Sequence, residues 1–239
     1  MEKEKAIFCW SGGKDSSLCL YDVLQEGKYD VKYLLTTVNG NFNRISMHGV
    51  REDLLDQQAH QIGIPLKKVY VKEGSYAEYE TNMEKMLLEA KSEGIDHVIF
   101  GDIFLEDLRK YREDNLAKVN MQAVFPLWKK DTKELVQKFI SLGFKTITCC
   151  VNDFYLGEDM VGAEIDSKFI QTLPANVDPC GEYGEFHTFC FDGPIFKNKI
   201  EFSKGEKVYK PVEVKEDGVC SSSPKTKGFW YCDLVPSPY

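Results

Sequence analysis

The chain has 239 residues and a mass of 27.4 kDa, which fits one large domain or two small ones. Its 43% hydrophobic and 28% charged residues are typical of a globular protein and exclude collagen-like, coiled-coil and disordered chains. The net charge of −8 argues against a protein whose affinity comes mainly from nucleic-acid phosphate, although a local basic groove is compatible with it.

Hydropathy predicts a cytoplasmic protein with no membrane partner. No apolar run approaches the roughly 18 to 20 residues that cross a bilayer. The charged segment at residues 1–5 leads into only five apolar residues, fewer than a signal peptide needs.

Cysteines occur at positions 9, 19, 149, 150, 180, 190, 220 and 232, and none forms a C-x-x-C pair. A zinc knuckle, an iron–sulfur site and a redox dithiol therefore lack their usual local signature. We expect most of these cysteines to be small buried hydrophobic residues.

The first hundred residues alternate apolar runs with amphipathic segments. Buried strands are predicted at 6–10, 33–38, 68–71 and 97–100. Helices are predicted at 16–25, at 50–62 and from a capping box at 75–78 through Leu87. This order implies an α/β fold, a parallel sheet with helices on both faces. Because ligands bind beyond the carboxyl ends of such strands, the loops after Trp10 and Phe100 are candidate sites.

The second half of the chain differs in character. A helix is predicted at 131–142 and a strand at 145–151, and short strands separated by turns follow at 186–191, 200–202, 208–214 and 229–234. The segment 221–225 is expected to be a loop. We therefore expect two domains, residues 1–125 and a smaller mixed α+β domain of residues 126–239, with the boundary near Pro126.

A glycine-rich hexapeptide follows the first predicted strand and opens the first predicted helix: Ser11, Gly12, Gly13, Lys14, Asp15 and Ser16. The glycines allow positive φ and a close approach of the backbone to a ligand. The N–H groups of the turn and the helix dipole favour an anion there, to which Lys14 adds a charge and the serines add hydroxyl donors. The hexapeptide predicts a phosphate-binding loop; the alternative is a tight turn with solvated charges.

The loop lacks the spacing of a Walker A motif and resembles the S-G-G-x-D-S signature of the PP-loop ATP pyrophosphatases. This resemblance implies ATP, with its β and γ phosphates held as a leaving group. Asp15 is unusual beside a phosphate unless a cation bridges the two, so Mg²⁺ is predicted with Asp15 as its ligand. Lys14, Mg²⁺ and backbone N–H groups would stabilise the departing pyrophosphate while an acceptor oxygen attacks the α-phosphorus.

A second unusual segment, Asp-Pro-Cys-Gly-Glu-Tyr-Gly-Glu-Phe-His-Thr-Phe, spans residues 178–189. Its candidate substrate-binding side chains are Glu182, Glu185, His187 and Thr188. The two glutamates are predicted to bind an amine, to orient an acceptor or to act as a general base, with Glu185 as the catalytic candidate. The alternative is a glycine-rich hairpin with solvated carboxylates.

Further candidates follow other predicted strands. Asp102 follows a buried strand, where a carboxylate faces a bound nucleotide, and is a catalytic candidate. Arg109 and Arg112 share a face of the next predicted helix and are candidates to clamp phosphate or an acceptor carboxylate. A solvated, salt-bridged helix is the alternative. His48 follows the second strand, within reach of an acceptor or of adenine.

These motifs together resemble the diphthine–ammonia ligase (diphthamide synthase) family over most of the chain. The resemblance rests on the phosphate loop, Phe-Gly-Asp-Ile at 100–103, Gly-Glu-x-Gly-Glu-Phe at 181–186 and Asp-Gly-Pro-Ile-Phe at 192–196. It implies a HUP-type domain that binds ATP, followed by a domain that carries Gly-Glu-x-Gly-Glu toward the acceptor. The implied reaction adenylates the carboxylate of diphthine, a modified histidine on elongation factor 2, and amidates it with ammonia, releasing AMP and pyrophosphate.

The sequence departs from the ligase pattern at several positions. Cys180 precedes the Gly-Glu pair, Tyr183 replaces a glycine and His187 replaces a glutamate. The Ser-Met-His-Gly stretch at 46–49 also differs from the usual glutamine-containing segment. These differences resemble a branch found in bacteria, which do not make diphthamide. The acceptor therefore stays open between protein-bound diphthine and a small-molecule carboxylate, for example one related to cobalamin.

Other functions are weighed by what the sequence contains. Thiolating tRNA enzymes usually carry C-x-x-C pairs or a basic RNA-binding domain, and the sequence shows neither feature. Glutamine-dependent synthetases carry a glutaminase domain, which is not evident either. Ammonia is therefore expected from solution or from a partner. A non-catalytic nucleotide-binding sensor is the alternative class, against which the Lys14–Asp15 pair argues. A homo-oligomer is compatible with the sequence.

Overall fold

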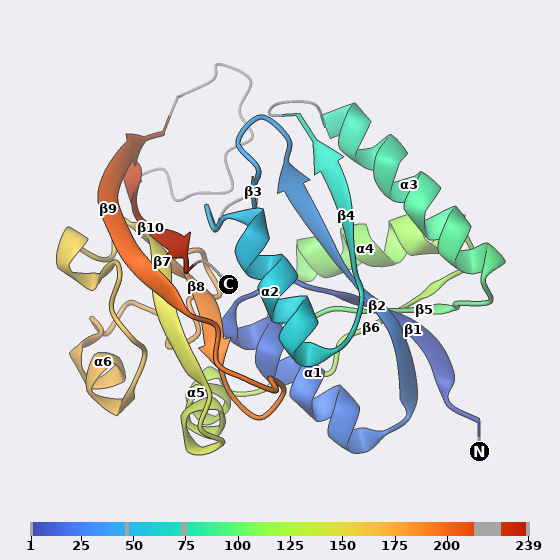
Figure 1. The fold of residues 1–239 in the computed structure, drawn as a ribbon, viewed down its shortest axis with the longest axis horizontal. Coiled ribbons are helices and arrows are strands. Elements are labelled where there is room, and N and C mark those ends of the chain that lie inside the picture. Colours follow the sequence, from blue (N-terminus) through green and yellow to red (C-terminus); the bar gives the residue numbers. More distant parts are fainter. Residues whose placement is uncertain (1, 46–47, 73–75, 213–225, 238–239) are drawn as a thin grey trace.

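The computed structural model describes residues 2–45, 48–72, 76–212 and 226–237. Two sheets lie side by side with helices between and around them (Figure 1). The predictions for Ser75, for 46–47, for 221–225 and for 213–214 of the strand predicted at 208–214 fall outside the described residues.

The first sheet has six strands in the order β3-β2-β1-β5-β6, with β4 also paired to β2. They are β1 (Glu4–Cys9), β2 (Tyr29–Asn39), β3 (Arg44–Ile45), β4 (Leu66–Val71), β5 (His97–Ile99) and β6 (Gln122–Val124). Every pairing is parallel except that of β2 with β3, which confirms the predicted parallel sheet. Strands β3 and β6 were not predicted, because strands this short show no hydrophobic period.

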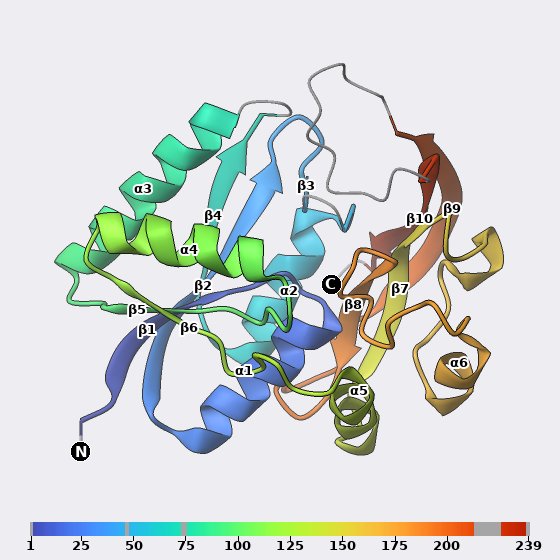
Figure 2. The ribbon, with the colours of Figure 1, turned by 180° about the vertical axis from the view of Figure 1, so that it is seen from behind.

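Helices cover both faces of this sheet, as predicted. Helices α1 (Lys14–Glu26) and α2 (Glu52–Ile62) lie on one face, and α3 (Tyr76–Ser92) and α4 (Glu106–Lys118) lie on the other (Figure 2). Successive residues of β1 explain this arrangement, because Phe8 packs in one core cluster with Leu18, whereas Ile7 packs in another with Leu87. None of the described helices is long and apolar enough to span a membrane.

The second sheet is antiparallel, in the order β8-β7-β10-β9. It consists of β7 (Lys145–Asn152), β8 (Phe186–Asp192), β9 (Phe202–Pro211) and β10 (Gly228–Pro236), accompanied by α5 (Thr132–Ser141), the 3₁₀ helix η1 (Glu158–Met160) and α6 (Ser167–Thr172). The prediction of separate strands at 200–202 and 208–214 was wrong. One strand, β9, runs through the polar residues between them, because its backbone pairs with β10 while its side chains are exposed.

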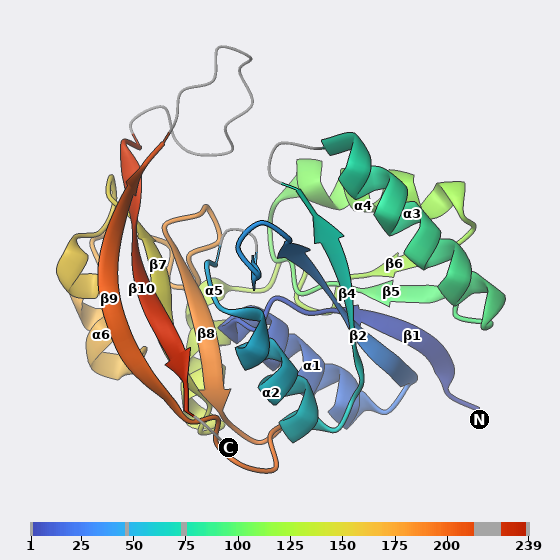
Figure 3. The same cartoon turned by 45° about the horizontal axis from the view of Figure 1, so that its top comes forward.

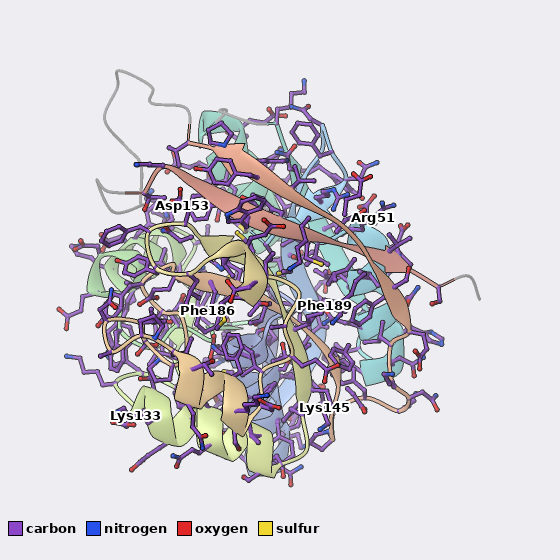
Figure 4. All side chains as sticks on the ribbon, turned by 90° about the vertical axis from the view of Figure 1, so that its left-hand side faces the viewer. Arg51, Lys133, Lys145, Asp153, Phe186 and Phe189 are labelled. Atoms are coloured by element: carbon purple, nitrogen blue, oxygen red, sulfur yellow. The ribbon has the colours of Figure 1, made fainter. Side chains whose placement is uncertain are left out.

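Helices α1 and α2 lie between the two sheets, so one apolar core serves both (Figure 3). Leu20 of α1, Phe139 of α5 and Phe189 of β8 belong to the same buried cluster. Phe186 and Phe189 lie within the second sheet (Figure 4). The backbone N–H of Cys190 donates to the carbonyl of Gly12 at 2.8 Å. The phosphate loop and the segment at 178–189 are therefore neighbours.

Candidate active site

The predicted phosphate loop connects β1 to α1. Gly12 has a φ of 76°, and a Cβ on it would lie 2.7 Å from Oε1 of Gln58, so a larger residue would displace the loop. Gly13 is the N-cap residue of α1, and its carbonyl accepts from Ser16 Oγ at 3.0 Å and from Ser17 N at 3.1 Å. The N–H groups that begin α1 thus lie at the carboxyl edge of the sheet, where an anion is favoured.

Gln58 of α2 supports this loop from inside the protein, and the sequence analysis missed it. The side chain is fully buried. Its Oε1 accepts from Trp10 Nε1 at 2.8 Å, and its Nε2 donates to the carbonyls of Gly12 at 2.9 Å and Cys190 at 2.6 Å. One amide therefore joins the end of β1, the phosphate loop and β8. The only local signal was a pair of glutamines, Gln57 and Gln58, within an otherwise apolar helical stripe.

Lys14 is held inside the protein by its neighbour in the sequence. Its side chain is 2% exposed, and Nζ donates to the carboxylate oxygens of Asp15 at 2.7 and 2.6 Å and to the carbonyl of Cys180. Its backbone N–H donates to Thr188 Oγ1 at 3.0 Å. Burial acts to lower the pKa of Lys14, but Asp15 and other nearby groups, including Glu182, outweigh it and the pKa is raised. The lysine is therefore a charged group that is already paired.

Glu185 lies inside its own loop. Its side chain is 2% exposed, and its two oxygens accept from the backbone N–H groups of Asp178 at 3.0 Å and Tyr183 at 2.9 Å. The structure thus differs from the predicted contact of Glu185 with an acceptor, because both oxygens are already occupied. A positioning role for Glu185 fits this geometry, and the alternative of solvated carboxylates does not.

Glu182 links this loop to the end of β5. Its Oε1 accepts from the N–H groups of Ile103 and Phe104, both at 2.9 Å. Burial raises the pKa of Glu182 to about 7, and the charge of Asp15 acts in the same direction, against the two hydrogen bonds that lower it. A carboxyl group that titrates near neutral pH is suited to proton transfer.

Three predicted substrate-binding residues meet at the phosphate loop. His48 Nδ1 lies 3.1 Å from the carbonyl oxygen of Thr188, which can only accept, so this nitrogen carries the proton. The rings of His48 and His187 are 4.7 Å apart. A Cβ on Gly13 would lie 3.1 Å from the Thr188 oxygen and 3.2 Å from His48 Cε1. Burial lowers the pKa of both histidines, that of His187 to about 3, so both rings are neutral at pH 7.

Asp102 follows β5 and is paired with Arg112 of α4. Arg112 Nε lies 2.9 Å from Asp102 Oδ2, and the aspartate side chain is 13% exposed. The guanidinium also lies 4.3 Å from the ring centre of Phe100. Because a Cβ on Gly101 would be 3.3 Å from Ser16 N, the β5 end lies against the start of α1. The ion pair of Asp102 and Arg112 therefore borders the phosphate loop, and the two charges of the pair neutralise each other.

Arg109 of α4 has partners of its own. Its Nε lies 2.7 Å from Glu113 Oε1, and its guanidinium stacks 4.9 Å from Phe125 and 4.6 Å from Trp128. Aromatic packing and the ion pair with Glu113 hold Arg109, and its joint clamp with Arg112 stays a prediction. The alternative of a salt-bridged helix describes Arg109 better.

A cavity of about 150 Å³ lies between the first sheet, α3 and α4. Apolar side chains, among them Met83, Leu87 and Phe100, form much of its wall, and Arg112 adds a cation. Cys9 ends β1 and Phe100 follows β5, so this cavity adjoins the carboxyl edge that carries the phosphate loop.

Asp15 has the chemistry required of a magnesium ligand. Its side chain is 29% exposed, and it lies near enough to Glu182 to influence the pKa of that carboxyl. Within the described ranges, no three His, Cys, Asp or Glu side chains are grouped to hold a metal. Magnesium at nucleotide sites commonly uses one or two carboxylates, with phosphates and water completing its shell. Asp15 fits that kind of site.

Comparison with known families matches residues 4–123 to the diphthamide synthase N-terminal domain and residues 131–219 to its C-terminal domain. The diphthine–ammonia ligases of Mus musculus and Homo sapiens are each 27% identical to the chain over an alignment of 225 residues, with a coverage of 83% of this chain and 82% of theirs. The Danio rerio ligase is 28% identical, over 83% of this chain and 86% of its own. A solved U34-tRNA thiolase, NcsA from Methanococcus maripaludis, aligns at 17% identity and a TM-score of 0.39, covering 60% of this chain and 59% of its own.

Proposed function

Because the chain belongs to the diphthamide synthase family, we propose that it is an ATP-dependent ligase that forms a carbon–nitrogen bond. In this reaction an acceptor carboxylate oxygen attacks the α-phosphorus of ATP, which yields an acyl-adenylate and pyrophosphate. Ammonia then attacks the acyl carbon, the carbon–oxygen bond to AMP breaks, and the nitrogen loses a proton. The observation that carries the proposal is the meeting of the phosphate loop, Glu182 and His48 at one edge of the sheet.

The phosphate loop is proposed to hold the β and γ phosphates. Gln58 fixes the Gly12 carbonyl and so holds the loop in place, and the N-terminus of α1 would stabilise the charge that grows on the leaving pyrophosphate. Lys14 supplies a charge that can turn from Asp15 toward phosphate, while Asp15 would hold Mg²⁺. When bound there, the metal neutralises negative charge on the phosphates.

The proton lost from nitrogen needs an acceptor near the phosphate loop. Glu182, with a pKa of about 7, exists in both protonation states at neutral pH and is our candidate. Neutral His48 has Nδ1 engaged with Thr188 and therefore presents Nε2 as a second hydrogen-bond acceptor, for the nitrogen or for the acceptor molecule.

The cavity between α3 and α4 is proposed to receive the purine base. Its apolar wall suits a flat ring, and Cys9 at its edge is two residues from Ser11 in the chain. The pair of Asp102 and Arg112 then lies between base and phosphates, where it can contact the ribose.

Acceptor recognition is assigned to the segment at 178–189. Tyr183 is 59% exposed beside Glu182 and offers a ring face to an acceptor. Protein-bound diphthine and a small-molecule carboxylate are the two acceptor classes to test, because His187 and Tyr183 replace residues of the ligase pattern.

The test measures AMP and pyrophosphate after incubation with Mg-ATP and ammonium chloride. Elongation factor 2 that carries diphthine is compared with a panel of small carboxylic acids and with no acceptor. We expect AMP only when an acceptor is present, and less of it when glutamine replaces ammonium. Formation of ADP and phosphate alone would refute the proposal, and tightly bound, unchanged ATP under every condition would support a nucleotide sensor instead.

A further inference from the structure

Strand β10 contacts the turn between β3 and α2, which includes His48, Gly49 and Val50. Asp233 of β10 accepts hydrogen bonds from Arg44 Nη1 at 2.9 Å and from Nε and Nη2 of Arg51 at 3.1 and 2.7 Å. Arg51 lies beside the β9–β10 pair (Figure 4). The hydrogen bond from Arg51 and then that from Arg44 lower the pKa of Asp233 to about 2, against the effect of burial. The carboxylate therefore stays charged throughout the neutral range.

A second contact from β10 holds the same turn. Gly49 has a φ of 68°, and a Cβ on it would lie 2.8 Å from Cδ1 of Tyr231, so its backbone packs directly on that ring. Arg44 Nη1 also donates to the carbonyl of Gly49 at 2.7 Å. The guanidinium that binds Asp233 thus fixes the turn as well.

His48 directly precedes Gly49 in this turn. Gly49 N donates to the carbonyl of Ile45 at 3.0 Å, and Ile45 N donates to that of Val50 at 2.8 Å. Leu35 is the last residue of β2 that pairs with β1, and β3 pairs with β2 beyond that residue. The turn therefore lies over the carboxyl end of β1. A displacement of the turn would therefore move the His48 ring away from the phosphate loop.

We propose that Asp233 is a positioning residue that holds His48 against the phosphate loop. It acts through Arg44 and Arg51, and Tyr231 supports the same turn. The catalytic consequence rests on the proposed function, whereas the placement of His48 does not. Strand β10 lies beyond residue 219, where the match to the family's C-terminal domain ends, so no comparison assigns it this role.

A second ion pair in the chain provides a matched control, because it joins two elements but is not bonded to the turn that carries His48. Asp22 of α1 lies 2.5 Å from Lys138 Nζ of α5 and 3.8 Å from Lys130 Nζ. Its side chain is 18% exposed, against 22% for Asp233, so the two carboxylates have similar burial and each faces two cations. Loss of either should destabilise the protein to a similar extent, but only Asp233 is bonded to the turn that carries His48.

The test compares Asp233→Asn with Asp22→Asn in the full chain. The NMR signal of the His48 Cε1–H group, assigned with His48→Gln, is followed from pH 3 to pH 8. We expect the Asp233→Asn protein to shift this signal and to raise the pKa of His48 toward its ordinary value of 6.5, because the ring becomes hydrated. Asp22→Asn should leave both unchanged. The KM for acceptor should rise about tenfold in Asp233→Asn alone, while the Kd for Mg-ATP stays within about twofold.

An unchanged His48 signal in Asp233→Asn, or an equal change in Asp22→Asn, would overturn the proposal. Circular dichroism checks that each variant folds, and Arg51→Lys, which retains the charge and loses the forked donor to Asp233, replaces Asp233→Asn if that variant does not fold. If wild-type protein forms no AMP with any acceptor, the proposed function fails, and the NMR comparison still decides the role of Asp233.

Discussion

The rings of His48 and His187 lie 4.7 Å apart beside the phosphate loop, and both belong to stretches that depart from the ligase pattern. The two departures therefore form one contact. A glutamate at position 187 would place a negative charge beside His48, whereas two neutral imidazoles bring no formal charge to this side of the phosphate loop. This contact is where we expect acceptor specificity to be set.

Replacement of His187 by glutamate tests that expectation. We expect His187→Glu to raise the pKa of His48, because an anion then lies beside its ring. If the glutamate that the ligases carry in place of His187 helps to bind diphthine, AMP formation with diphthine-bearing elongation factor 2 should rise about tenfold relative to wild type. His60→Glu, at an exposed position of α2, is the control and should change neither quantity. An unaltered pKa of His48 would contradict the predicted contact.

The Lys14–Asp15 pair predicts different outcomes for its two members. Lys14→Met fills a similar volume and leaves Asp15 29% exposed to water, so we expect the protein to fold normally. Asp15→Asn leaves a buried ammonium with a weaker partner and should cost about 2 kcal/mol of unfolding free energy. Both variants should release pyrophosphate at least about a hundredfold more slowly. Urea denaturation and a pyrophosphate assay measure the two effects, and near-normal turnover of either variant would exclude its proposed role.

We expect replacement of Gln58 to disturb the phosphate loop more than α2, the helix that carries it. Gln58→Leu leaves Trp10 Nε1 and the carbonyls of Gly12 and Cys190 without their amide partner, at a cost of about 2 to 3 kcal/mol. The loosened loop should weaken Mg-ATP binding about tenfold. Gln57→Leu, on the same helix, is the matched control. Isothermal titration calorimetry that gave equal affinities for the two variants would argue against the supporting role.

Glu182 makes stability depend on pH. Its pKa is raised in the folded protein from an ordinary value of 4.5 to about 7, so the folded state retains a proton that the unfolded chain releases. Stability contributed by the protonated group is therefore complete below about pH 4.5 and is lost as pH rises through 7, by about 3 kcal/mol. Glu182→Gln should remove this dependence. Urea unfolding between pH 4.5 and pH 8 measures it, with the exposed Glu201→Gln as control, and parallel curves for wild type and Glu182→Gln would contradict the assignment.

The cavity between α3 and α4 can be filled by mutation. Met83→Trp projects a large ring into it and should weaken Mg-ATP binding about tenfold if the purine base enters there. Leu88→Trp changes the same helix at a side chain that is 52% exposed and should leave the affinity unchanged. Equal Kd values for Met83→Trp and wild type would show that the base binds elsewhere.

Local features of the sequence predicted much of the fold. The apolar run ending at Trp10, followed by two glycines, placed the phosphate loop between β1 and α1. The helices predicted at 16–25 and 50–62 end at Gly27 and Gly63, which adopt φ values of 69° and 81°. Asp131 caps α5 through hydrogen bonds from Lys133 N and Glu134 N, at the predicted start of that helix. The domain boundary near Pro126 stays a prediction.

Side-chain pairing across the fold could not be predicted in the same way. Gln58, Glu182 and Asp233 are polar residues whose partners lie in other segments, and a hydrophobic period reports only which face is buried. Glu185 was interpreted as a solvent-facing or acceptor-facing group because a carboxylate among glycines gives no sign of the N–H groups that surround it. Strand β9 was predicted as two strands for a similar reason, because the backbone pairing that holds it to β10 does not affect hydropathy.

The bond between Arg44 and Asp233 joins residues 189 positions apart, and that of Arg51 spans 182. Chains are synthesised from the N-terminus at about 5 to 20 residues per second, so the arginines leave the ribosome many seconds before their partner. During that interval the N-terminal sheet can form while the turn over its phosphate loop still lacks its anchor. The contact between this turn and Asp233 therefore forms only after β10 has been synthesised.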